Sequence, residues 1–169
     1  MTAFMYTTSV PALKQMLNSL RAILDKAEAH AAAKKIEPGV LLQARLYPDM
    51  FPLIRQVQIA CDFAKGIAAR LAGVDIPVHE DNEQSFADLH ARIAKVLAFV
   101  DSVRPDQFEG SEIREIVLRP GTPREQKMTG QTFLVHYALP QFYFHATTAY
   151  AILRHNGVEI GKLDYMGSF

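Results

Sequence analysis

The sequence is poor in several features that mark particular classes of protein. It contains a single cysteine, Cys61, and no tryptophan. One cysteine excludes an intramolecular disulfide and a zinc site built from several thiolates. The 18 basic and 18 acidic side chains cancel to a formal net charge of zero. Because nucleic acids and anionic membrane surfaces are bound through a surplus of positive charge, we expect neither as a partner.

Long apolar runs are also missing. No stretch approaches the roughly 20 consecutive apolar residues of a transmembrane helix. Met1 to Val10 lacks the basic start and the apolar stretch of a signal peptide. We therefore expect no membrane association and a cytoplasmic protein, in which the lone thiol stays reduced. With 169 residues, 49% of them hydrophobic, the chain has the size and composition of one folded domain over residues 1–169.

Apolar residues recur at three- and four-residue steps in four segments, which is typical of amphipathic helices. The first helix is predicted to start at an N-cap, Ser9, with Pro11 in its first turn, and to stop before Pro38. The second follows a predicted N-cap at Asp49 and ends at Gly73. Its apolar stripe consists of Leu53, Ile54, Val57, Ala60, Cys61, Ala64, Ile67, Ala68 and Leu71.

The third and fourth helices have clearer boundaries. The third opens at Ser85, whose hydroxyl can accept the N–H of Asp88, and it ends before Pro105. The fourth runs from about Pro140 to Asn156, and Gly157 supplies a left-handed cap. The final dozen residues are too apolar for a free tail.

Between the third and fourth helices the pattern changes to short β-branched runs. Residues 113–118 and 132–137 read as an outgoing and a returning strand, so residues 111–138 are predicted to form a β-hairpin or another ordered excursion. Four helices with one apolar stripe each bury their faces best against one another. The predicted fold is mostly α, a four-helix bundle with a short β-hairpin between the third and fourth helices.

Histidine and acidic side chains near the apolar stripes are the candidate chemical groups. No two of the six histidines have the three- or four-residue spacing of a helical metal pair. His145 and His90 fall on apolar helix faces, where each is either a hydrogen-bonded core histidine or a ligand or base. Asp62 lies at the edge of a buried stripe, and we expect it to pair with an arginine or lysine. Cys61 on that stripe is interpreted as a small buried hydrophobe.

Aromatic side chains are dense on the fourth helix. Tyr143 and Tyr150 lie on its outer side together with Thr147 and Arg154. Tyrosine and arginine are favoured at interfaces, so this side is either a surface for a partner or a surface covered by the apolar C-terminal segment.

Two long stretches carry a family resemblance. The first reads YPDMFPLIRQVQIACDFAK from Tyr47, continuing to ARLAG from Ala69, and the second reads LPQFYFHATTAYAILRHNG from Leu139, ending in GKLDYMG from Gly161. Over essentially its whole length the chain resembles an uncharacterised bacterial family, the domain of unknown function numbered nineteen-ninety-three. That family belongs to the DinB/YfiT-like superfamily of four-helix bundles. The resemblance implies the fold and no established activity.

The resemblance also implies where a metal would bind. The wider superfamily often holds a divalent metal with one histidine on the second helix and a His-x-x-x-His pair on the fourth, followed by Leu-Arg-x-x-Gly. That ending matches Leu153–Gly157, so the pair falls on Gln141 and His145, and the remaining position falls near Gln58. Amides are poor ligands for zinc or nickel, so we expect no metal and no other cofactor. In the alternative, zinc or nickel binds and Asp62 or His90 completes the ligand set.

Two functions of different kinds follow, and the sequence leaves enzymatic activity undecided. The first is a non-catalytic bundle that binds a small molecule or a partner and forms a homodimer, with a candidate pocket at His145, Gln141, Gln58, Asp62 and His90. The second is a metal-dependent thiol transferase or hydrolase of the DinB/YfiT type, in which His145 is a ligand. A metal-free enzyme with His145 as general base is a third possibility.

Overall fold

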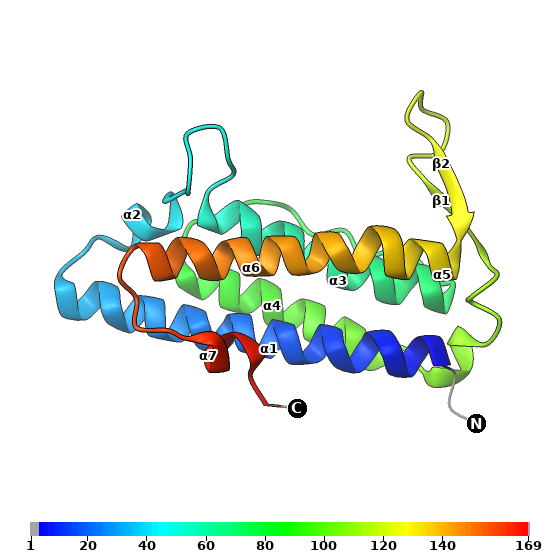
Figure 1. Ribbon diagram of the computed structural model, residues 1–169, viewed down its shortest axis with the longest axis horizontal. Coiled ribbons are helices and arrows are strands. Elements are labelled where there is room, and N and C mark those ends of the chain that lie inside the picture. The colour runs from blue at the N-terminus through cyan, green and yellow to red at the C-terminus, as the bar shows by residue number, and fades with distance from the viewer. Residues whose placement is uncertain (1–3, 169) are drawn as a thin grey trace.

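Four long helices lie side by side along the longest axis of the molecule (Figure 1). The structure is a computed structural model that describes residues 4–168. The long helices are α1 (Phe4–Lys34), α3 (Leu53–Ala72), α4 (Phe86–Ser102) and α6 (Leu139–His155). The shorter ones are α2 (Pro38–Leu42), a 3-10 turn (Pro105–Phe108), α5 (Gly130–Thr132), a π-helical segment (Phe133–Ala138) and α7 (Lys162–Met166).

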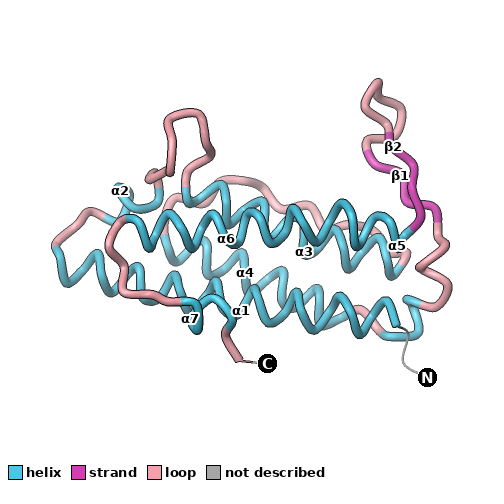
Figure 2. The backbone as a smooth tube through the Cα atoms, in the orientation of Figure 1, coloured by secondary structure: helices cyan, strands magenta, loops and turns pink. Residues whose placement is uncertain are grey.

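One small hairpin interrupts the helices. Strands β1 (Glu115–Leu118) and β2 (Gln126–Thr129) pair antiparallel, with Glu115 opposite Thr129 and Leu118 opposite Gln126. Figure 2 shows this hairpin rising from one end of the helices, while the loop before α3 rises near the other end. The predicted mostly helical fold with a short antiparallel hairpin is confirmed. None of the helices in residues 4–168 has the length and apolarity to cross a membrane.

The core is built around α3, which packs against α1, α4 and α6. All of its predicted stripe is buried, namely Leu53, Ile54, Val57, Ala60, Cys61, Ala64, Ile67, Ala68 and Leu71. Burial raises the pKa of the Cys61 thiol to about 12. Cys61 is therefore the small buried hydrophobe that its position on the stripe predicts.

The predicted boundaries hold where a local signal fixes them. Ser85 Oγ accepts the Asp88 N–H at 3.1 Å, and Asp88 Oδ2 accepts the Ser85 N–H at 3.0 Å, a complete capping box. Gly73 and Gly157 take left-handed φ angles of 70° and 86° after α3 and α6. A residue with a side chain is disfavoured at such angles, and the helices stop there.

Two predicted N-caps are wrong. Helix α1 already begins at Phe4, and the Ser9 hydroxyl donates within it to the Met5 carbonyl at 2.6 Å. Met5 is buried and extends the apolar stripe by a turn, so Pro11 lies inside the helix. Asp49 lies in a turn closed by Met50 N–H and Tyr47 O at 3.0 Å. The N-cap of α3 is instead Pro52, whose backbone is extended.

The predicted return strand at residues 132–137 is wrong. Strand β2 comes earlier, and residues 130–155 form one continuous helical path through the π-helical segment. Thr129 Oγ1 caps its start by accepting the Thr132 N–H at 3.3 Å. Pro140 has no N–H for the carbonyl of His136, and in an α-helix its ring collides with that carbonyl. A wider π-helical turn just before Pro140 relieves this conflict.

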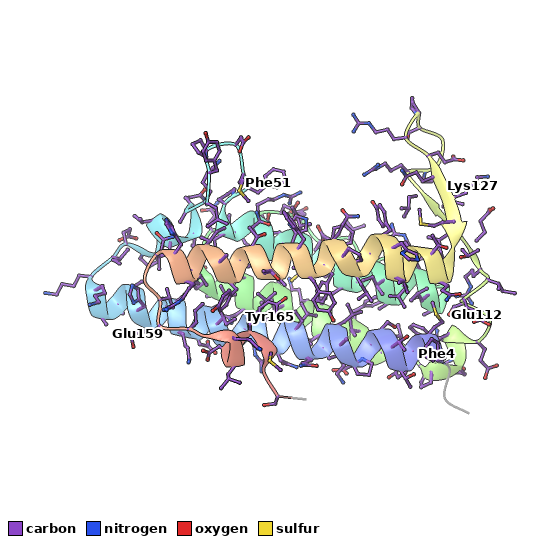
Figure 3. All side chains as sticks on the ribbon, viewed as in Figure 1. Phe4, Phe51, Glu112, Lys127, Glu159 and Tyr165 are labelled. Atoms are coloured by element: carbon purple, nitrogen blue, oxygen red, sulfur yellow. The ribbon has the colours of Figure 1, made fainter. Side chains whose placement is uncertain are left out.

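The C-terminal segment covers part of α6 and α1. Helix α7 packs on α1, where Gln15 Nε2 donates to the Met166 carbonyl at 2.7 Å. Figure 3 labels Tyr165 on α7. Its hydroxyl lies 2.8 Å from Thr147 Oγ1, and its ring contacts that of Tyr150 edge-on at 5.8 Å. The prediction that this segment is not a free tail is confirmed, and it covers Thr147 and Tyr150 on the outer side of α6, whereas Arg154 stays exposed.

Candidate functional site

His145 pairs with α3 through an amide rather than through another imidazole. Its Nδ1 lies 2.7 Å from Gln56 Oε1, and Gln56 Nε2 donates to the Phe51 carbonyl at 3.1 Å. Because the Gln56 NH2 group already serves as a donor, its oxygen must accept, which assigns the proton of His145 to Nδ1 and the lone pair to Nε2. The residue of α3 that binds His145 is thus Gln56, which the family resemblance did not indicate.

The surroundings of His145 favour the neutral imidazole. Its ring stacks on Phe63 at 6.0 Å and 15°, and the Phe144 ring meets it edge-on at 5.2 Å. Burial, followed by the positive charge of Arg55, lowers the pKa of His145. A half-buried histidine with a hydrogen-bonded Nδ1 and a depressed pKa has the properties of a structural core histidine.

The other predicted pocket residues face different neighbours. Gln58 Nε2 donates to Glu83 at 2.8 Å, and its Oε1 accepts from Arg55 at 3.1 Å. Gln141 Nε2 donates to the Tyr137 carbonyl on its own helix at 3.3 Å. His90 faces α1, where its Nε2 lies 3.3 Å from Asp25 Oδ1. No hydrogen bond or ion pair within residues 4–168 joins either amide or His90 to His145.

Asp62 belongs to a charged cluster centred on Arg92, whose side chain is only 1% exposed. The Arg92 cluster consists of Asp62, Lys65, Asp81 and Glu83 around Arg92. Arg92 approaches Asp62 at 2.8 Å, Asp81 at 3.0 Å and Glu83 at 2.9 Å. Lys65 adds a second contact to Asp62 at 2.9 Å. The predicted ion pair of Asp62 is confirmed.

A metal of the superfamily type does not fit these residues. The position aligned with the helix-two ligand, Gln58, uses both ends of its amide in other hydrogen bonds. Neutral amides are in any case weak donors for zinc or nickel. Across residues 4–168, no three histidine, cysteine, aspartate or glutamate side chains come together in a way that can hold a metal ion.

A cavity of about 230 Å³ lies toward the C-terminal end of α3, beyond the Gln56–His145 pair. We call it the α3 cavity; its lining residues are Asp62, Phe63, Gly66, Ile67, Arg70, Leu118, Arg119, Phe133 and Tyr137. They come from α3, from the end of β1 and from the π-helical segment. Phe63 links it to His145, since its ring lies 6.0 Å from the imidazole and 6.3 Å from the Tyr137 ring. Asp62 is the one residue of the predicted pocket that also lines this cavity.

Sequence comparison assigns the chain to a family. A family model described as a domain of unknown function, DUF1993, matches residues 5–166. The chain belongs to the DUF1993 family. This DUF1993 protein is also similar to a DinB family member protein from Shewanella denitrificans, known from its crystal structure. The two are 46% identical with a TM-score of 0.91, and the match covers 97% of this chain and 92% of that one. No curated protein matches.

Several site residues of this DUF1993 protein were not predicted from the sequence. Arg92 carried a usable signal, because it interrupts the apolar stripe of α4 between Leu89 and Ile93 and both neighbours are buried. A charged residue within such a stripe indicates a buried ion pair. No sequence signal marks Arg119 as a site residue, since its position in space depends on where the hairpin turns.

Proposed function

We propose that this protein is a non-catalytic DinB-like four-helix bundle that binds a small molecule in the α3 cavity. The observation that carries the proposal is that the cavity is walled by the π-helical segment, through Phe133 and Tyr137. Single π-helical turns within longer helices are rare and recur at functional sites. Small-molecule sites are concave, largely apolar and equipped with a few polar groups, as this cavity is.

The absence of a catalytic role is proposed from the hydrogen bonds of the candidate groups. The imidazole of His145 is engaged by Gln56, and the amide of Gln58 is engaged at both ends. Asp62 is held by Arg92 and Lys65. These contacts join α3 to α6 and α3 to α4, so the groups have a structural role in helix packing.

A thermal-shift screen of small metabolites tests the proposal. We expect compounds that fit the cavity to raise the melting temperature, since a ligand that binds only the folded chain stabilises it. Leu118→Phe fills the cavity from β1 and should abolish these shifts. Leu163→Phe is the matched control, because Leu163 lies on α7, is 81% exposed and does not line the cavity. Shifts that survive Leu118→Phe, or no shift with any compound, would refute the proposal.

We further propose that the protein acts in the cytoplasm as a homodimer. Two exposed aromatic side chains flank the Gln56–His145 pair and support the dimer. Phe51, on the loop before α3, is 55% exposed, and Phe144 on α6 is 57% exposed (Figure 3 labels Phe51). Apolar side chains grouped in this way mark interfaces when a second chain covers them. Light scattering should give the mass of two chains, and Phe144→Lys should give one; a wild-type monomer at tens of micromolar would contradict the dimer.

A further inference from the structure

Two arginines line the α3 cavity without a carboxylate partner. Within residues 4–168, neither partly buried Arg70 nor exposed Arg119 forms an ion pair, whereas the buried cations Lys65 and Arg92 both do. Arg70 donates one hydrogen bond, from Nη1 to the Gly66 carbonyl at 3.2 Å. A guanidinium has five N–H donors, so most of the hydrogen-bonding capacity of Arg70 remains free.

The position of Arg70 is fixed by its own helix and by an aromatic ring. Its guanidinium carbon lies 5.6 Å from the centre of the Phe133 ring, within the range of a cation–π contact. A Cβ at Gly66 would come within 2.6 Å of Arg70 Nη1, so the missing side chain of Gly66 makes room for the guanidinium. Arg70 is partly buried, and that burial lowers its pKa. A partly desolvated cation without a counterion has lost some of its hydration, and an anion placed beside it offsets that loss.

Arg119 comes from the hairpin and has an unusual backbone. Its φ is 51°, in the left-handed region that residues with side chains rarely adopt. The turn holds it there, because the Arg119 carbonyl accepts from the Thr122 hydroxyl at 2.9 Å. Such conformations collect at ligand-binding sites. The turn thereby places a second, exposed arginine at the lining of a cavity whose other arginine comes from α3.

The remaining charge in the cavity is already neutralised. Asp62 Oδ1 is bound by Arg92 at 2.8 Å and by Lys65 at 2.9 Å. The uncompensated charge of the lining is therefore positive. The rest of the lining is apolar or aromatic: Phe63, Ile67, Leu118, Phe133 and Tyr137.

We propose that the ligand of the α3 cavity is a small organic oxyanion, with its carboxylate or phosphate on Arg70 and Arg119 and a ring-sized apolar body among the aromatic residues. The inference rests on the proposed function and specifies the chemistry of its ligand. Guanidinium groups bind carboxylate and phosphate oxygens through paired N–H donors. A cavity of about 150 Å³ holds one benzene ring, so about 230 Å³ holds a ring with its acidic group.

Three probes that share one ring test this chemistry: benzoate, phenyl phosphate and the neutral benzamide. We expect an anionic probe to bind with a Kd at least tenfold lower than that of benzamide, followed by amide shifts in a nitrogen-15-labelled sample. A lower Kd for benzoate identifies a carboxylate ligand, and a lower Kd for phenyl phosphate identifies a phosphate ester. Equal binding of benzamide and both anions would overturn the inference while leaving cavity binding intact. No binding of any probe would count against the proposed function as well.

Variants separate the two arginines from general charge. Arg70→Met should raise the Kd for the preferred anion about tenfold or more, the usual effect of losing a charge-assisted hydrogen bond. Arg119→Asn should act in the same direction, since asparagine tolerates the left-handed backbone. The matched controls are Arg154→Met on α6 and Arg124→Asn in the hairpin turn, and neither residue lines the cavity. An equal loss in these controls would show that the protein attracts anions without a site.

Gly66→Ala tests the same site without removing a charge. The new methyl displaces the Arg70 guanidinium, and alanine favours a helix more than glycine does. We expect the melting temperature to hold or rise while the Kd for the anion rises at least fivefold. Unchanged anion binding in a stable Gly66→Ala protein would show that binding does not depend on the Arg70 guanidinium lying against Gly66, contrary to the inference.

Discussion

Replacing Arg92 by leucine should destabilise the protein strongly at neutral pH. The Arg92 side chain is 1% exposed and that of Glu83 is 8% exposed, so the substitution leaves a buried carboxylate without its cation. Removing one partner of a buried pair costs about 3–5 kcal/mol. Asp62 and Asp81 are more than a third exposed and keep Lys65 and Arg55, so each adds only about 0–1 kcal/mol. We expect a loss of about 3–5 kcal/mol in the free energy of unfolding, measured in urea at pH 7.

The pH dependence of the stability of Arg92→Leu tests whether Glu83 causes that loss. Burial alone would raise the pKa of Glu83, but hydrogen bonds from Arg92 and Gln58 outweigh it and hold the pKa below the ordinary value of 4.5. The wild-type protein therefore gains stability from Glu83 above about pH 4.5 and loses it as the pH falls through the folded-state pKa. Without Arg92 the burial remains, the pKa of Glu83 moves above the ordinary value, and acid should relieve the variant. The deficit should shrink between pH 7 and pH 5.

A double variant completes the test. Arg92→Leu combined with Glu83→Gln removes the buried charge, so it should be at least 1 kcal/mol more stable than Arg92→Leu alone. A deficit of less than about 1 kcal/mol for Arg92→Leu, or a deficit that is the same at pH 5 and pH 7, would show that Glu83 does not depend on Arg92 for its charge.

Three smaller predictions concern single groups. Because burial raises the pKa of Cys61 to about 12, a thiol reagent at pH 8 should label it only after denaturant is added; rapid labelling of the native chain would contradict its burial. Burial and the charge of Arg55 lower the pKa of His145 below its ordinary value of 6.5, so the midpoint of its proton NMR titration should lie below pH 6.5. The free energy of unfolding should then fall as the pH drops below about 6.5, because the unfolded chain binds the proton more readily. His145→Gln should make the free energy of unfolding less dependent on pH in this range. Ser85→Ala should cost about 1 kcal/mol through the lost cap, whereas Ser102→Ala, which removes only an exposed bond to the Phe99 carbonyl, should cost less in the same urea assay.

Local signals in the sequence predicted much of the fold. The apolar stripe of α3, the capping box at Ser85 and the glycines that end α3 and α6 depend on a few neighbouring residues, and all were found in place. The start of α1 at Phe4 and the π-helical path through Phe133 depend on packing against other helices. Propensity alone favoured a strand in that second segment, and burial against the helices reversed the preference.

The site was harder to predict because its parts are far apart in the chain. Asp62 was expected to pair with a cation, but the sequence did not identify Arg92 on another helix as that cation. The family resemblance directed attention to His145 and Gln58, whereas the partner of His145 is Gln56. Arg70 and Arg119 meet at one cavity only because the hairpin lies beside α3, and no spacing in the sequence records that arrangement.

Binding of a ligand in the α3 cavity is tested most directly by a backbone amide titration of the nitrogen-15-labelled protein. With benzoate or phenyl phosphate added, saturable shifts are expected for residues 62–70, 118–119 and 133–137, the segments that wall the cavity. Those shifts should be lost in Leu118→Phe and should persist in Leu163→Phe. Shifts centred on Gln56 and His145 instead, or no shift with either compound at millimolar concentration, would contradict binding in this cavity.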